Sequence, residues 1–179
     1  GTHRFTWDLR HAGAYHPSVR RSGRRGPMVV PGTYTLELSL GEMSIRHPLT
    51  VKMDPRIKKS GITREDLREQ EKLTLNILSL LSRARAAAEH ISMPVNRLTE
   101  GGPLSAADKN RLARLNELTR QLVTNEDIRY PRPMLIDQIS YLSGMLMRAD
   151  QKPGNEAYKR YRELKQELDN IIDIADNLF

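Results

Sequence analysis

Residues 161–178 read YRELKQELDNIIDIADNL, and their pattern determines how the second half of this sequence folds. Apolar side chains recur at alternating steps of three and four residues, at Tyr161, Leu164, Leu168, Ile171, Ala175 and Leu178. This spacing places them in one narrow stripe along a helix, and such a stripe is buried only when neighbouring helices cover it. The sequence therefore predicts a C-terminal helix that packs against other helices.

Three segments further upstream have the same helical periodicity. The first begins at a capping-box-like sequence, residues 63–66, and Pro94 is expected to end it or to lie just beyond its end. The second begins at Ser105, and the third follows the proline-rich connector at 130–133. Short breaks separate these helices, so residues 63–179 are expected to form an antiparallel four-helix bundle.

The first 53 residues have the two-residue periodicity of β-strands instead. Residues 33–40 read TYTLELSL and alternate polar with apolar side chains, Gly41-Glu42 fits a hairpin turn, and the chain returns as a second strand to Met53. A further strand is expected at residues 5–10, with Trp7 in the core beside Phe5 and Tyr34. Many glycines and prolines predict a long loop over residues 11–32.

The sequence Asp54-Pro55-Arg56 ends the sheet, because proline cannot donate to a strand ladder. This divides the chain into a β-module over residues 1–56, a linker over 57–62 and a helical region over 63–179. So few strands bury little apolar surface by themselves. We therefore expect an incomplete module of α+β class, completed by strands that lie upstream in a longer polypeptide.

The chain has 179 residues and a net charge of +7. All of this excess lies in residues 1–60, which hold 11 Lys and Arg against 4 Asp and Glu. A basic chain suggests nucleic acid, but the long helices carry mixed charges, so no nucleic-acid partner is expected. No apolar run is long enough to span a membrane. The absence of cysteine excludes disulfides, a thiolate nucleophile and Cys-ligated zinc.

Few residues have a pattern that indicates catalysis or metal binding. The five histidines have none of the spacings typical of metal sites. Acids in the first helix, among them Glu65 and Glu71, alternate with basic residues, as on a solvated face. Asp169, Asp173 and Asp176 share one side of the last helix and could bind a divalent cation, but a polar stripe is the commoner reading. We expect no catalytic, cofactor or metal residue in this chain.

The sharpest charge feature is the arginine cluster of the loop, formed by Arg20, Arg21, Arg24 and Arg25. Guanidinium groups bind phosphate, sulfate and carboxylate groups. The cluster could therefore contact an anionic glycan or an acidic protein. The alternatives are a solvated loop and a loop docked on an upstream domain.

Three motifs resemble one family. Residues 1–10 (GTHRFTWDLR), 30–36 (VPGTYTL) and 49–56 (LTVKMDPR) are similar to the C-terminal end of large bacterial BNR/Asp-box repeat proteins, which are sortilin-like and often labelled glycosyl hydrolases. The resemblance implies an Ig-like segment after a β-propeller, followed by a helical tail, in an exported protein. The W-D-x-R and P-G-x-Y pair also resembles the Ig-like domain of flagellar hook-capping proteins. No residue here matches the propeller repeats or their catalytic groups.

These observations predict a non-catalytic accessory region that packs against, or orients, the β-propeller upstream in the same polypeptide. The alternative is a binding module that contacts an anionic glycan or an acidic protein through residues 20–25. No cofactor is expected in either case.

Overall fold

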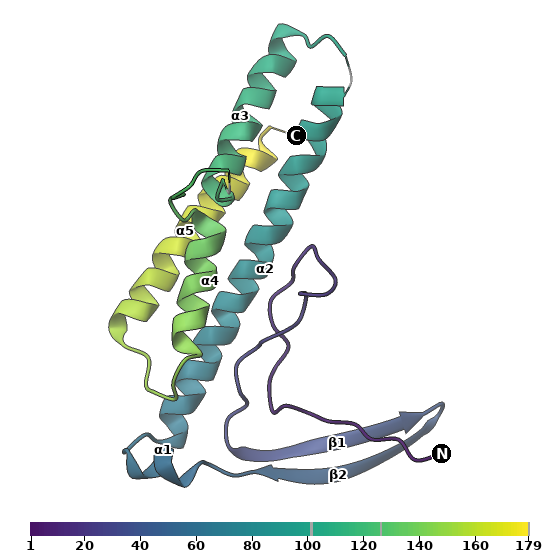
Figure 1. Cartoon of the computed structure of the whole chain (residues 1–179), viewed down its shortest axis with the longest axis vertical. Coiled ribbons are helices and arrows are strands. Elements are labelled where there is room, and N and C mark those ends of the chain that lie inside the picture. The colour runs from purple at the N-terminus through teal and green to yellow at the C-terminus, as the bar shows by residue number, and fades with distance from the viewer. Residues whose placement is uncertain (101, 126, 179) are drawn as a thin grey trace.

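A two-stranded antiparallel sheet comes first in the chain, and five helices follow it in the described residues. The computed structural model describes residues 1–100, 102–125 and 127–178. Strands β1 and β2 span Gly32–Leu40 and Met43–Val51, and helices α1 to α5 span Pro55–Lys59, Arg64–Glu100, Ala106–Leu122, Leu135–Leu146 and Asn155–Asp176. Figure 1 shows the hairpin projecting sideways from one end of the helices. The predicted α+β class is confirmed.

Helix α2 begins with the predicted capping box. The Asp66 N–H donates to Thr63 Oγ1 at 3.1 Å, and the Thr63 N–H donates to Asp66 Oδ2 at 2.9 Å. Two backbone donors that a helix start leaves free are satisfied in this way.

The prediction that Pro94 ends this helix or lies just beyond it is wrong, because α2 continues through Pro94 to Glu100. Proline inside a helix removes one backbone hydrogen bond and costs about 3 kcal/mol. Beyond it, however, Val95 and Leu98 pack against the apolar core. Burial of these two side chains offsets the cost, so tertiary packing decides where the helix ends.

The length of α2 changes how the other helices pack. Its 37 residues extend about 55 Å at 1.5 Å per residue, whereas α3 has 17 residues and α4 has 12. In Figure 1, α3 and α4 follow one another along α2, both running opposite to it, and α5 returns beside them. This differs from the simple antiparallel four-helix bundle that we expected, because α3 and α4 occupy successive stretches of one long helix.

One apolar core joins α2, α3, α4 and α5. The predicted stripe of α5 faces it: Leu164, Leu168, Ile171 and Ala175 are buried. None of the helices within the described ranges is both long and apolar enough to cross a membrane.

The hairpin has the predicted register, with Leu38 opposite Ile45 and Leu40 opposite Met43 around the turn at Gly41. Gly41 has a φ of 58°, which favours glycine. Yet the apolar face of the hairpin is not covered. Leu38 is 62%, Ile45 65% and Leu40 78% exposed.

The strand predicted over residues 5–10 does not form, and the structure has one isolated bridge there, between Arg10 and Met28. Trp7 Nε1–H donates to the Arg10 carbonyl at 3.0 Å, and the Arg10 N–H donates to Asp8 Oδ1 at 3.1 Å. Such local bonds compete with a strand ladder. Leu9 also has a φ of 59°, which ends the extended backbone.

The core position expected for Phe5 and Trp7 is also wrong. Phe5 is 87% exposed, and Trp7 lies at the surface. The contact expected between Trp7 and Tyr34 does form, edge to face with ring centroids 5.7 Å apart. The aromatic pair therefore lies on the open hairpin rather than inside a sandwich.

The linker predicted over residues 57–62 is partly helical, because α1 covers Pro55–Lys59. The Asp54 side chain accepts a hydrogen bond from the Arg56 N–H at 2.8 Å and caps this helix. Pro55 stands at its first turn, where the missing N–H costs nothing. The sheet ends before Asp54, as predicted.

Candidate functional site

The glycine-rich loop that carries the arginine cluster is docked on α2. Figure 1 shows residues 11–30 running alongside this helix. Glu71 Oε1 accepts from His11 Nε2 at 2.8 Å and from the Val30 N–H at 3.0 Å, so it holds both ends of the loop.

The far end of the loop has its own contacts with α2. The Tyr15 N–H donates to Ser82 Oγ at 2.9 Å, and Arg85 Nη1 donates to the Tyr15 carbonyl at 2.7 Å. The Tyr15 hydroxyl donates to Glu89. This hydrogen bond is the main reason that the pKa of Tyr15 is raised. The loop is thus fastened to α2 at His11, Tyr15 and Val30.

Two glycines let the loop close on itself. A Cβ on Gly13 would lie 1.8 Å from the Arg24 carbonyl oxygen, and one on Gly26 would lie 2.1 Å from the His11 carbonyl oxygen. The Gly13 N–H donates to the Gly23 carbonyl at 2.7 Å. Only glycine permits this approach of two backbone segments.

The loop, α2 and α4 together border an open hollow of about 630 Å³, which we call the arginine hollow, and its four loop arginines are solvent-exposed. This volume is typical of small-ligand sites. Its charged or titratable lining residues are His16, Arg20, Arg21, Arg24, Arg25 and Arg85.

The arginine hollow has a strongly positive lining. No Asp or Glu lines it. Within the described ranges, the guanidinium groups of the four loop arginines make no hydrogen bond and no ion pair. Burial lowers the pKa of Arg85, and the charge of Asp137 only partly opposes this effect.

His16 is neutral in this setting. Its pKa is lowered, first by burial and then by the positive charges of Arg85 and Arg21. Its Nδ1 accepts a hydrogen bond from the Ser18 N–H at 2.9 Å, which leaves the proton on Nε2. The imidazole can therefore donate one hydrogen bond to an anion.

The sequence singled out Arg20, Arg21, Arg24 and Arg25, and the structure places all four on this one hollow. It did not single out Arg85, which lies about 60 positions later in a stretch rich in alanine. No local pattern marks Arg85, because only docking of the loop brings it beside the cluster. The serines of α4 that complete the lining, Ser140 and Ser143, were missed for the same reason.

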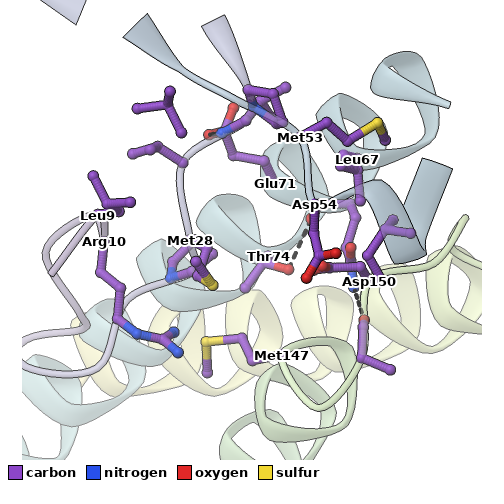
Figure 2. A pocket seen from close by; sticks show the side chains of 18 of the residues that line it. Leu9, Arg10, Met28, Met53, Asp54, Leu67, Glu71, Thr74, Met147 and Asp150 are labelled. Atoms are coloured by element: carbon purple, nitrogen blue, oxygen red, sulfur yellow. Dashed lines mark hydrogen bonds between the residues drawn. The ribbon is translucent and has the colours of Figure 1, made fainter. Parts of the chain in front are cut away.

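A smaller cavity, of about 160 Å³, lies where the loop, the end of β2 and the start of α2 meet the end of α4 (Figure 2). Its carboxylates are Asp54, Glu71 and Asp150. Asp54 is hydrogen-bonded to Arg56, and this bond lowers its pKa. Glu71 accepts the two loop bonds described above. In a pair of catalytic carboxyls the general acid needs a raised pKa, and Asp54 does not meet that requirement.

One residue of the acidic stripe of α5, Asp169, forms ion pairs. Asp169 contacts Lys165 Nζ at 2.5 Å and Arg83 Nη2 at 2.9 Å. The hydrogen bond from Lys165 is the largest cause of its lowered pKa. Across the part of the chain that the structure describes, no three His, Asp or Glu side chains lie close enough to hold a metal ion together.

Comparison of this chain with known protein families, with curated proteins and with solved structures finds no match.

Proposed function

We propose that this chain is a non-catalytic accessory region whose hairpin docks on the β-propeller domain of an exported protein of the BNR-repeat type. The observation that carries this proposal is the uncovered apolar face of the β1–β2 hairpin. The choice of partner rests on the sequence resemblance of residues 1–56.

The two faces of the hairpin differ in character. Leu36, Leu38, Leu40, Met43 and Ile45 are exposed on one face, while the opposite face carries threonine, serine and an ion pair between Glu37 and Arg46. In the described residues, neither outer edge of the hairpin pairs with another strand. An isolated two-stranded hairpin is marginally stable in water.

The partner that suits this surface is another β-structure. Strands laid against the open edge would pair with its free backbone groups, and apolar side chains would cover Leu38 and Ile45. Full burial of one such side chain contributes about 1.5–3 kcal/mol. In this proposal the added strands complete an Ig-like module, of which the hairpin is one part.

The connections between the hairpin and the helices suit a role in orienting the propeller domain. The capped helix α1 follows β2 directly, and Glu71 holds the Val30 N–H two residues before β1. The β1 end of the hairpin is therefore anchored on α2, and the β2 end leads into the capped helix α1. The helical region would act as a rigid support that sets the direction of the hairpin.

Amide hydrogen exchange tests the docking. We expect the amides of residues 32–51 to exchange quickly in the 179-residue chain and to be protected in a polypeptide that also contains the propeller. Leu38→Lys, on the apolar face, should remove this protection. The matched control Thr35→Lys, on the opposite face, should preserve it. Equal exchange in the short and long polypeptides would refute the docking.

A glycosidase panel tests the absence of catalysis. The 179-residue chain should release no product from aryl glycosides of the common sugars. Turnover that disappears on substitution of Asp150 in the smaller cavity would overturn the proposal.

A second candidate function is anion binding at the arginine hollow. The observation that favours it is the placement of five arginines from two parts of the chain around one cavity without an acidic residue. Calorimetry with inorganic phosphate and with heparin tests it. Binding should weaken as salt rises and should be lost in the Arg20→Gln/Arg24→Gln variant.

A further inference from the structure

We propose that the arginine hollow recognises a phosphoryl dianion, as carried by a phosphorylated saccharide or by free phosphate. This inference rests on the second proposed function, anion binding at the same hollow. It adds the chemical class of the ligand, which the sequence left open between phosphate, sulfated glycan and carboxylate.

Charge balance favours a phosphoryl group over a single carboxylate or a sulfate ester. Five guanidinium groups line the hollow, and four of them have no partner within the described residues. A phosphomonoester carries about −1.5 to −2 charges near pH 7 and presents three strong acceptor oxygens. A carboxylate or a sulfate monoester carries one charge. The phosphoryl group therefore neutralises more of this lining with one small ligand.

Hydrogen-bond geometry supports the same class. Arginine presents its N–H groups in a planar fork that binds two oxygens of a phosphate together. Arg20 and Arg24 come from the loop, whereas Arg85 projects from α2. Donors from separate elements suit a tetrahedral ligand, whose oxygens point in several directions. His16 adds an Nε2–H donor.

The remaining lining has room for an organic group. Leu78, Leu81 and Met147 supply an apolar side, and Ser140 of α4 supplies a hydroxyl. The volume of about 630 Å³ exceeds what a phosphate ion alone would fill. A ring of sugar size bonded to the phosphate would occupy this part of the hollow.

The backbone of the loop is also organised before binding. The loop is held at both ends by Glu71 and near its tip by Ser82 and Arg85. A ligand would therefore not have to order the backbone of the loop, which lowers the entropic cost of binding.

Calorimetric titration at constant ionic strength tests the class. The ligands are glucose 6-phosphate, glucose 6-sulfate, glucuronate, glucose and inorganic phosphate. Glucose 6-phosphate should bind at least tenfold more tightly than glucose 6-sulfate and glucuronate, and glucose should not bind. Inorganic phosphate distinguishes the source: equal affinity identifies the free ion, and affinity at least tenfold weaker identifies the phosphorylated sugar.

Two variants with equal change in charge serve as test and control. Arg20→Gln/Arg24→Gln should weaken binding of glucose 6-phosphate at least tenfold, while Arg114→Gln/Arg162→Gln, on α3 and α5, should change it less than twofold. A nuclear magnetic resonance titration of His16 gives a local readout, since a bound dianion opposes the charges of Arg85 and Arg21. The His16 resonances should shift on binding in the control variant but not in the test variant.

The two proposals fail in different ways. If the sulfate and carboxylate sugars bind as tightly as glucose 6-phosphate, and the Arg20→Gln/Arg24→Gln variant binds none of them, anion binding stands and the phosphoryl class is refuted. If no anion binds, or if both double variants bind equally well, anion binding at this hollow is refuted as well.

Discussion

Substitution of Glu71 by alanine should release the loop from α2 and destabilise the whole chain. Glu71 Oε1 accepts one hydrogen bond from the Val30 N–H and one from His11 Nε2, and its side chain is only 19% exposed. Val30 is buried, so an unsatisfied N–H there costs about 1–3 kcal/mol. The bond from the half-buried His11 adds about 0.5–1 kcal/mol. Together these contributions should lower the free energy of unfolding by about 1.5–4 kcal/mol.

Urea denaturation followed by circular dichroism measures this change, and hydrogen exchange locates it. Protection should fall in residues 11–30 before it falls in α2. Glu71→Gln is the matched variant, because its amide oxygen can still accept a hydrogen bond from the Val30 N–H. Its free energy of unfolding should fall by less than half as much as that of Glu71→Ala. A change below about 0.5 kcal/mol in Glu71→Ala, with unaltered exchange in the loop, would show that the loop does not depend on this carboxylate.

Three further substitutions test other parts of the argument. Pro94→Ala restores one backbone hydrogen bond in α2 and should raise the free energy of unfolding by up to about 3 kcal/mol, as measured in urea; a decrease would mean that the proline stabilises the helix. Gly13→Ala would place a Cβ 1.8 Å from the Arg24 carbonyl oxygen. The loop should therefore lose its protection from hydrogen exchange, and the arginine hollow should lose its affinity for anions. An unchanged affinity would contradict the loop geometry described above. The pKa of Asp66 is lowered in the folded state, mainly by the hydrogen bonds from Thr63. The contribution of Asp66 to folding stability is therefore complete above its unfolded pKa, near 3.8, and is lost as the pH falls through the lower folded pKa. The difference in stability between the wild-type chain and Asp66→Asn should accordingly shrink below pH 4, and a difference that is independent of pH would contradict this assignment.

Local signals predicted the parts of the fold that depend on neighbouring residues. The seam of α5 and the capping box at Thr63 are properties of a few residues on one helix, so the sequence was sufficient for both. The extent of α2 was not predictable in this way. Pro94 is a correct local signal for a helix end, but the packing of Val95 and Leu98 against other helices overrides it.

In the candidate site, too, the sequence predicted the residues that are close together in the chain but not those that only the fold brings together. The four loop arginines lie close together in the sequence and were identified together, whereas Arg85 belongs to the site only because Tyr15 docks beside it. The strand expected over residues 5–10 has a correct alternation of side chains. It fails because Trp7 and Asp8 bond to the backbone of Arg10, a contact that alternation does not express.

The docking of the loop on α2 helps to decide between two interpretations of the arginine cluster, a solvated loop and an anion-binding site. A solvated loop would let the guanidinium groups separate and so reduce their mutual repulsion. Here the loop is held by hydrogen bonds to Glu71, Ser82 and Arg85, and two glycines pack its backbone closely. These contacts keep like charges around one cavity, where burial already lowers the pKa of Arg85. In the proposed anion-binding role, a bound anion would relieve this repulsion, so the bonds that hold the loop would also favour binding.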